Sequence, residues 1–271
     1  MKDILVHLDD GPRCPARLEL ALGLAHRFGS RLTGLFARLE SHAPSAVAHR
    51  ASDALAAARE AARTRFAAAV AAAGVEGRWW QLAHGEAAHV VSETAFCARY
   101  ADLVVVGQHK AGLHLVPEDL NETLVHNCGR PVLVVPAAGT FARPAENVVV
   151  AWNASREAVR ALNDAKPLLA AAREVTLLSL HGAHEDRGDA MAEVPAVDVV
   201  DHLARHGIAA RREHLTGEDV GKMDLLLSRL ADLGADLLVM GAHAPHGLLP
   251  ARANATRHIL KHATVPVLLS Q

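Results

Sequence analysis

The sequence predicts an α/β protein built from two tandem domains, each an open, five-stranded parallel sheet flanked by helices. The first observation is an internal repeat, since residues 101–108 read ADLVVVGQ and residues 235–242 read ADLLVMGA. The second is that an apolar strand opening on Pro-Val-Leu follows each copy, at 131–136 and 266–270. A repeat this long exceeds a solenoid unit and matches a small domain.

The elements of the first half follow from apolar runs and helical spacing. Leu18 to Ala25 carry apolar residues at helical spacing before the stop at Gly29. The expected strands are Ile4–Leu8, Arg31–Ala37, Arg78–Leu82, Leu103–Val106 and Val132–Val135. The further expected helices are Val47–Ala73, Glu86–Tyr100 and Asp119–Cys128. Within the third strand, Trp79 and Trp80 must point to opposite faces, so at least one is expected in the core.

The second half repeats this order. Its expected strands are Val148–Trp152, Glu174–Leu180, Ala209–Leu215, Leu237–Met240 and Val267–Leu269. Its expected helices are Arg156–Ala172, Ala192–His206, Asp219–Leu233 and Thr256–His262. The segment Ala137–Glu146 contains glycine, proline and small residues, as a linker does. We therefore place the domains at 1–137 and 147–271.

The nearly continuous apolar strands indicate parallel sheets covered on both faces, with all strand carboxyl ends on one edge, where open α/β sheets bind ligands. The closing strands, Val132–Val135 and Val267–Leu269, are apolar edges that need cover. We expect them to pair antiparallel within one chain, as an internal pseudo-dimer. The sequence leaves open whether whole chains then form a homodimer.

The amino-acid composition disfavours several classes of binding partner and indicates a compartment. The chain of 271 residues is 51% hydrophobic and 21% charged with a formal net charge of −2, so nothing favours nucleic acid or an anionic membrane as a partner. No apolar run approaches the length of a membrane helix. The three cysteines, Cys14, Cys97 and Cys128, show no C-x-x-C spacing. With no signal peptide apparent, a reducing cytoplasm is the expected compartment.

Several motifs together resemble the universal stress protein family in its tandem form. They are Asp-Leu-Val-Val-Val-Gly at 102–107, the closing Pro-Val-Leu strands, the segment Asn153–Ala158 and the stretch 256–270. The resemblance covers the whole chain and implies an adenine-nucleotide alpha-hydrolase-like fold. One branch of that family binds ATP through a Gly-x2-Gly-x9-Gly-Ser/Thr loop after the fourth strand and an Asp at the end of the first. Such a loop cradles phosphate with backbone N–H groups and a helix N-terminus.

The first copy departs from this ATP-binding pattern. Asp9 matches the nucleoside-contacting Asp and Gly107 matches the first glycine, but Lys110 replaces the second glycine. The Gly-Ser pair falls on Glu118 and Asp119, two carboxylates at a helix N-terminus. They complement the helix dipole as caps and repel a triphosphate, so we expect no ATP in this half.

The second copy departs less, and nothing in its loop is expected to repel an anion. Gly241 matches the first glycine, while Ala244 replaces the second and Pro245 removes an N–H donor. The residues expected around a phosphate at the N-terminus of the last helix, or facing the nucleoside, are Gly241, Ala244, Arg252, Asn254, Thr256 and Asn153. The lost glycines disfavour ATP here but leave weak binding open.

Other chemistry finds little support. The histidine pairs His202/His206 and His258/His262 have i, i+4 spacing, but no cysteine or third ligand accompanies them, so we expect surface histidines and no metal site. A less favoured candidate metal site is a loop site made by His181, His184 and Glu185.

We find no catalytic residues, because no Gly-x-Ser-x-Gly elbow, nucleophilic cysteine motif or Gly-x-Gly-x-x-Gly turn occurs. The expected function is that of a universal stress protein acting as a non-catalytic stress-response binding factor with an unknown protein partner. The alternative is an ATP-binding protein with slow hydrolysis through the second domain.

Overall fold

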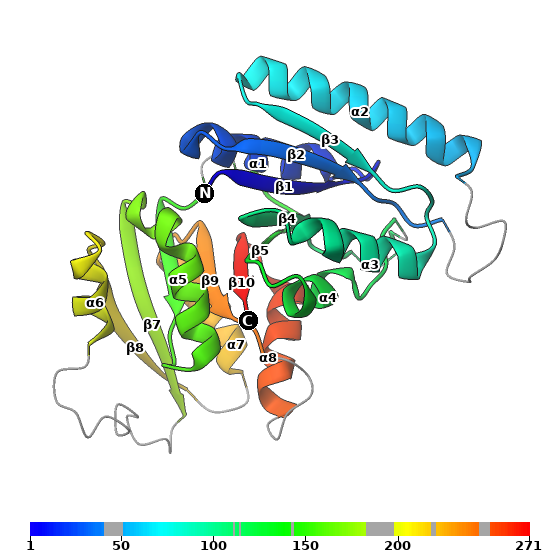
Figure 1. The fold of residues 1–271 in the computed structure, drawn as a ribbon. Helices are drawn as coiled ribbons and strands as arrows, with labels where there is room; N and C mark the ends of the chain where they lie inside the picture. The colour runs from blue at the N-terminus through cyan, green and yellow to red at the C-terminus, as the bar shows by residue number, and fades with distance from the viewer. Residues whose placement is uncertain are drawn as a thin grey trace.

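A computed structural model describes residues 1–40, 51–110, 112–113, 115–141, 144–182, 198–217, 221–243 and 250–271. Both halves of the chain alternate strands with helices, and all strands belong to one sheet (Figure 1). In the first half the strands are β1 (Asp3–Leu8), β2 (Arg31–Phe36), β3 (Gly77–Gln81), β4 (Leu103–Gly107) and β5 (Val132–Val135). Its helices are α1 (Cys14–Phe28), α2 (Asp53–Ala73), α3 (Ala87–Ala98) and α4 (Leu120–Asn127).

The second half has the same order of elements. Its strands are β6 (Asn147–Ala151), β7 (Glu174–Gly182), β8 (Arg211–Gly217), β9 (Leu237–Gly241) and β10 (Val267–Ser270). Its helices are α5 (Arg156–Ala170), α6 (Val199–Arg205), α7 (Lys222–Asp232) and α8 (Pro250–His262). Three expected helices begin outside the described residues: Val47–Ala73, Ala192–His206 and Asp219–Leu233.

The ten strands run in the order β3-β2-β1-β4-β5-β10-β9-β6-β7-β8, so each half arranges its own five strands identically. Pairing is parallel within each half, as predicted. The halves meet where β5 and β10 pair antiparallel, with Leu133 opposite Leu268. The predicted pairing of the closing strands is therefore confirmed, and it joins what was expected as two sheets into one.

Two apolar layers cover the sheet because neighbouring strand residues point to opposite faces. Ile4 packs into the layer beneath α1, α2, α5 and α6, whereas Leu5 packs into the layer beneath α3, α4, α7 and α8. Each layer contains residues of both halves, so the core continues across the β5–β10 junction (Figure 1). Within the described ranges, no helix combines the length and the hydropathy that crossing a membrane requires.

Polar contacts add to this junction. The Gln108 side chain donates to the backbone oxygens of Leu260 and Ala263 at 3.1 and 3.2 Å, near the end of α8. Arg257 of α8 also lies 2.9 Å from Glu122 of α4. Helices of the two halves are thus tied together beside the paired closing strands.

Candidate functional site at the strand ends

The carboxyl ends of β1 and β4 are neighbours because these strands pair in parallel. Asp9 follows β1 and Gly107 ends β4, so the structure brings these two predicted residues to one edge of the sheet. The corresponding strands of the second half, β6 and β9, also pair in parallel and bring Asn153 and Gly241 together. Because β5 and β10 are antiparallel, this second strand-end site lies at the opposite edge of the continuous sheet. Open α/β sheets bind ligands at such strand ends, so these two strand-end sites are the candidate ligand-binding sites.

Both carboxylate oxygens of Asp9 already have hydrogen-bond partners within the protein. Its Oδ1 accepts the Gly11 N–H at 2.8 Å, and its Oδ2 accepts a guanidinium N–H of Arg17 at 2.8 Å. Asp9 and Arg17 are only 6% and 5% exposed. Burial alone would raise the pKa of Asp9, but the charge and hydrogen bond of Arg17 outweigh burial and hold that pKa below its usual value. The first half therefore contains a buried, compensated ion pair where a nucleoside-contacting carboxylate was expected.

Arg17 also fills the space beside Gly107. A Cβ added to Gly107 would lie 2.2 Å from the Arg17 guanidinium, and Arg17 further donates to the His7 backbone oxygen at 2.7 Å. The Asn121 side chain donates to the Gly107 oxygen at 2.9 Å. The first glycine of the expected phosphate cradle is thus packed against a side chain of α1.

His7 completes this buried cluster. Its Nε2 lies 2.7 Å from the Ala37 oxygen, which requires a proton on that nitrogen, and its Nδ1 lies 3.8 Å from Asp9 Oδ2. Burial, followed by the nearby charge of Arg17, lowers the pKa of His7 to about 4. His7 is therefore neutral at physiological pH, and the charge of Asp9 is balanced by Arg17 alone.

Three predicted loop residues of the first half are exposed, in contrast to the buried cluster around Asp9. Lys110, Glu118 and Asp119 are all exposed. Asp119 is the N-cap residue of α4, but its side chain accepts no capping hydrogen bond, and α4 itself begins at Leu120. The expectation that Glu118 and Asp119 act as side-chain caps is therefore wrong. Both remain exposed carboxylates at a helix N-terminus.

In the second half, Asn153 is exposed and engaged locally. Its Oδ1 accepts the Ser155 N–H at 3.1 Å, the same turn that Asp9 makes with Gly11. Ser155 caps α5, since its hydroxyl accepts the Ala158 N–H at 3.2 Å. Asn153 thus serves to start a turn and carries no charge toward a ligand.

Gly241 owes its residue type to helix packing. An added Cβ would lie 2.5 Å from the backbone carbon of Glu157 and 2.6 Å from the Ala158 nitrogen, so the first turn of α5 rests directly on this glycine. The Glu157 carboxylate lies 3.2 Å from His243 Nε2. Glu157 of α5 thus adds a carboxylate near this strand end that the sequence did not reveal, whereas the expectation that the loop itself holds no repelling group concerns residues 244–249, which lie outside the described part.

Thr256 is not at a helix N-terminus. Helix α8 begins at Pro250, six positions earlier than expected, so Thr256 lies inside the helix and is 2% exposed. Its hydroxyl accepts the His243 backbone N–H at 3.3 Å. Ala244 lies outside the described residues, and so do the side chains of Arg252 and Asn254. Thr256 is therefore not positioned to donate to a phosphate at a helix end.

The histidine pairs have partners of other kinds. His206 lies 3.1 Å from the Lys166 ammonium, and His258 lies 3.0 Å from an Asp224 oxygen. The described residues contain no group of three ligand-type side chains that could hold a metal ion. The side chain of His181 and residues His184 and Glu185 lie outside the described part, so the metal question stays a prediction.

Three residues that shape these sites were not identified from the sequence: Arg17, His7 and Glu157. A signal existed for Arg17, which precedes Ala21 by four positions and Leu24 by seven, and so shares the buried face of α1. A cation on an apolar helix face requires a buried anion, and Asp9 is the nearest acidic residue that is itself buried. No comparable pattern marks Glu157.

Comparisons with known proteins agree with the observed architecture. The profile of the Universal stress protein family matches residues 1–136. No curated protein sequence matches the chain significantly. A universal stress protein structure from Archaeoglobus fulgidus DSM 4304 superposes with a TM-score of 0.76, at 17% identity, covering 99% of this chain and 98% of that one.

Two structures from Pseudomonas aeruginosa are similar over the whole chain. A functionally unknown protein of strain PAO1 gives a TM-score of 0.60 at 18% identity, covering 100% of this chain and 92% of its own. A putative universal stress protein of strain UCBPP-PA14 gives 0.59 at 19% identity, covering 100% and 93%. At these identities the likeness establishes the fold, including the tandem arrangement of its halves.

Proposed function

We propose, since this chain belongs to the universal stress protein family, that it is a non-catalytic binding factor of the stress response. It acts through surfaces of its tandem fold, as an internal pseudo-dimer, and uses no nucleotide cofactor. We further propose that it works in the cytoplasm with a protein partner, and not with nucleic acid or membrane. The formal net charge of −2 supports this choice of partner.

The Arg17–Asp9 pair is the observation that carries the proposal. A nucleoside hydroxyl would have to reach a carboxylate that is 6% exposed and compete there with the Gly11 N–H and a guanidinium N–H, both at 2.8 Å. Releasing Arg17 would leave it uncompensated in a site where it is 5% exposed, which is strongly unfavourable. The residues present in the first half therefore do not fit ATP.

The second half supports the same conclusion on different grounds. Gly241 is covered by the α5 backbone, Thr256 is buried within α8, and Glu157 adds a negative charge nearby. Among the described residues of this strand end, a triphosphate would meet the Glu157 carboxylate, which repels it. We therefore do not favour slow ATP hydrolysis through this half.

The test uses the purified full chain. The protein is denatured, any released nucleotide is identified and quantified by mass spectrometry, and the folded protein is assayed for phosphate release from MgATP. We expect far less than stoichiometric nucleotide and phosphate release at the background rate. Stoichiometric ATP or ADP, together with turnover that Thr256→Val abolishes, would establish the ATP-binding alternative.

A further inference from the structure

The two outer edges of the sheet differ in chemistry. Among the described strands, β3 and β8 end the sheet, and each pairs on one side only. The edge of β8 begins with three charged residues, Arg211, Arg212 and Glu213, which discourage further strand pairing. The edge strand β3 reads GRWWQ, with two tryptophans and a single charge.

The outward backbone groups of β3 can be assigned from its pairing with β2. The Leu32 N–H donates to the Glu76 oxygen at 2.8 Å, and the Leu82 N–H donates to the Phe36 oxygen at 3.1 Å. Residues two apart on a strand direct their backbone groups to the same side, so the even-numbered positions face β2. The N–H and C=O groups of Gly77, Trp79 and Gln81 therefore face the outer edge.

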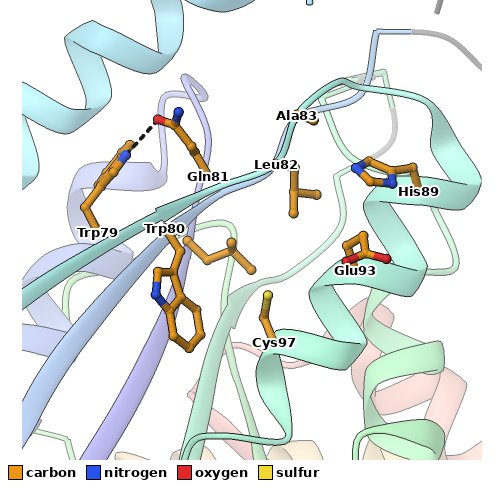
Figure 2. Close-up of a pocket in the computed structure, with 9 residues that line it drawn as sticks. Trp79, Trp80, Gln81, Leu82, Ala83, His89, Glu93 and Cys97 are labelled. Carbon is orange, nitrogen blue, oxygen red and sulfur yellow. Dashed lines mark hydrogen bonds between the residues drawn. The ribbon is translucent and has the colours of Figure 1, made fainter. Parts of the chain in front are cut away.

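The side chains of β3 divide between the two faces. Trp79 packs toward α2, with its ring 5.7 Å from that of Phe66. Trp80 lies on the α3 face, where two pockets of about 450 and 430 Å³ share Trp80 and Cys97 as lining residues. Figure 2 shows the first pocket bordered by Trp80, Leu82 and Cys97 and, on α3, by His89 and Glu93, with Trp79 on the side of α2. Both tryptophans are partly buried, and each packs against the core layer of its own face, as expected from their alternation.

Exposed aromatic side chains in α3 and just after it extend this surface. Phe96 is 49% exposed and Tyr100 is 65% exposed, and both line the second pocket. Their rings meet edge to face at 5.6 Å. Such a concentration of exposed aromatic area marks interaction sites more often than ordinary surface does.

The second pocket carries a net positive charge. Its charged lining residues are Asp3, Arg31 and Arg78. Arg31 is paired with Asp3, yet its buried Nε has no hydrogen-bond acceptor within the described structure. The Arg78 guanidinium lies 5.3 Å from the Trp80 ring, a cation–π contact that leaves its donors available. An acidic group is the complement of this pocket.

We propose that β3 accepts an extended segment of a partner protein as an additional strand. Backbone groups of the segment pair with those of Gly77, Trp79 and Gln81. Its side chains on the α3 face then repeat every second residue, about 7 Å apart, which matches one pocket on either side of Trp80. An acidic side chain enters the pocket beside Arg78, and an apolar one, two positions away, enters the pocket beside Leu82.

This inference deepens the proposed binding role by naming the surface and the chemistry of the partner. It concerns the sheet edge at β3 and uses none of the strand-end residues. Loss of peptide binding would therefore leave the nucleotide measurements unchanged, so the two proposals fail independently.

The test is selection of random twelve-residue peptides displayed on phage against the immobilised full chain. We expect enriched sequences that place Asp or Glu two positions from an apolar residue. Synthetic copies of the enriched peptide should bind at least tenfold more weakly to Arg78→Glu and to Trp80→Ala, because each loses one pocket contact. The matched control is Arg205→Glu on α6, which makes the same change of charge in the second half of the chain. This variant should bind the peptide like the wild type.

Two further variants test strand pairing itself. Gln81→Pro removes an outward N–H and leaves the bonds to β2 intact, so it should weaken binding at least tenfold. If that variant fails to fold, N-methylation of alternate peptide positions replaces it, and only the set of positions facing β3 should weaken binding.

Three results would overturn the proposal. One is the absence of any enriched peptide pattern. Another is peptide binding that Trp80→Ala weakens but that Gln81→Pro and N-methylation leave unchanged. The peptide would then occupy a pocket without adding a strand to the sheet. The third is self-association of the chain, seen by analytical ultracentrifugation and lost in Trp80→Ala, which would make a second copy the occupant of β3.

Discussion

The two halves repeat one fold but place different groups beside the equivalent glycine. In the first half, Arg17 of α1 reaches Gly107 at the end of β4; in the second, the backbone of Glu157 in α5 contacts Gly241 at the end of β9. Arg17 neutralises a buried Asp9, whereas Glu157 faces His243 near the surface. A repeated backbone therefore does not imply a repeated site, because the local charges decide what each strand end can hold.

The largest expected difference between the halves is in ion-pair energetics. Arg17→Met leaves the Asp9 carboxylate buried without its cation, and we expect the free energy of unfolding to fall by about 3–5 kcal/mol. Glu157→Gln, in a shallower contact with a histidine, should cost about 1 kcal/mol or less. Urea denaturation of both variants provides the comparison.

The control for this prediction is the double variant Arg17→Met with Asp9→Leu, which removes both charges and should recover much of the lost stability. Equal losses for Arg17→Met and Glu157→Gln would contradict the asymmetry between the halves.

The next difference is the dependence of stability on pH. The pKa of His7 is about 4 in the folded chain and 6.5 as its ordinary value, so between these values the unfolded chain binds a proton that the folded chain does not. Stability from a neutral His7 is fully present above pH 6.5 and is lost as the pH falls toward 4, by about 3 kcal/mol. Ala151 stands at the corresponding place in β6 and cannot contribute.

Unfolding free energies measured between pH 7 and pH 4 test this. His7→Gln keeps a donor for the Ala37 oxygen and should flatten the pH dependence relative to the wild type. A variant whose slope equals that of the wild type would show that His7 is not the source.

Gly107 and Gly241 should respond differently to an added methyl group. Gly241→Ala clashes with the α5 backbone, and we expect a loss of about 1–3 kcal/mol that no side-chain change relieves. Gly107→Ala clashes with the end of the Arg17 side chain instead. In a chain that already carries Arg17→Met, Gly107→Ala should lower the free energy of unfolding by less than it does in the wild type. In contrast, Glu157→Ala should not reduce the loss caused by Gly241→Ala.

The smallest difference concerns helix starts. Ser155→Ala removes a hydroxyl that accepts the Ala158 N–H, and should cost about 1 kcal/mol. Replacing Glu118 and Asp119 by Gly and Ser removes no capping hydrogen bond and should change stability by about 0.5 kcal/mol or less. Thermal melts of both variants, compared at one pH, would reveal a reversed order if the carboxylates stabilise α4 through its dipole.

Element types and most strand positions could be predicted from the sequence because buried parallel strands are continuous apolar runs. Strand β5 matches its expected bounds, and β10 differs by one residue. The start of α8 was misplaced although Pro250 is a typical first residue of a helix, because the family's phosphate loop was expected to extend to Thr256.

The candidate sites were less predictable because they depend on pairs of distant side chains. Asp9 and Gly107 could be named from their motifs, yet Arg17, which controls both, becomes relevant only when α1 folds back onto the ends of β1 and β4. Hydrophobic periodicity identifies the buried face of a helix but not the partner of a charge on that face. The Glu157–His243 contact joins residues of α5 and of the loop after β9, and it has no sequence signature at all.

Calorimetric titration of the full chain with MgATP tests most directly the claim that the protein's own residues close both strand ends to nucleotide. We predict no saturable heat of binding up to millimolar ATP, for the wild type and for Thr256→Val alike. Stoichiometric binding with micromolar affinity, weakened by Asp9→Asn in the first half or by Thr256→Val in the second, would contradict the account and identify which strand end is open.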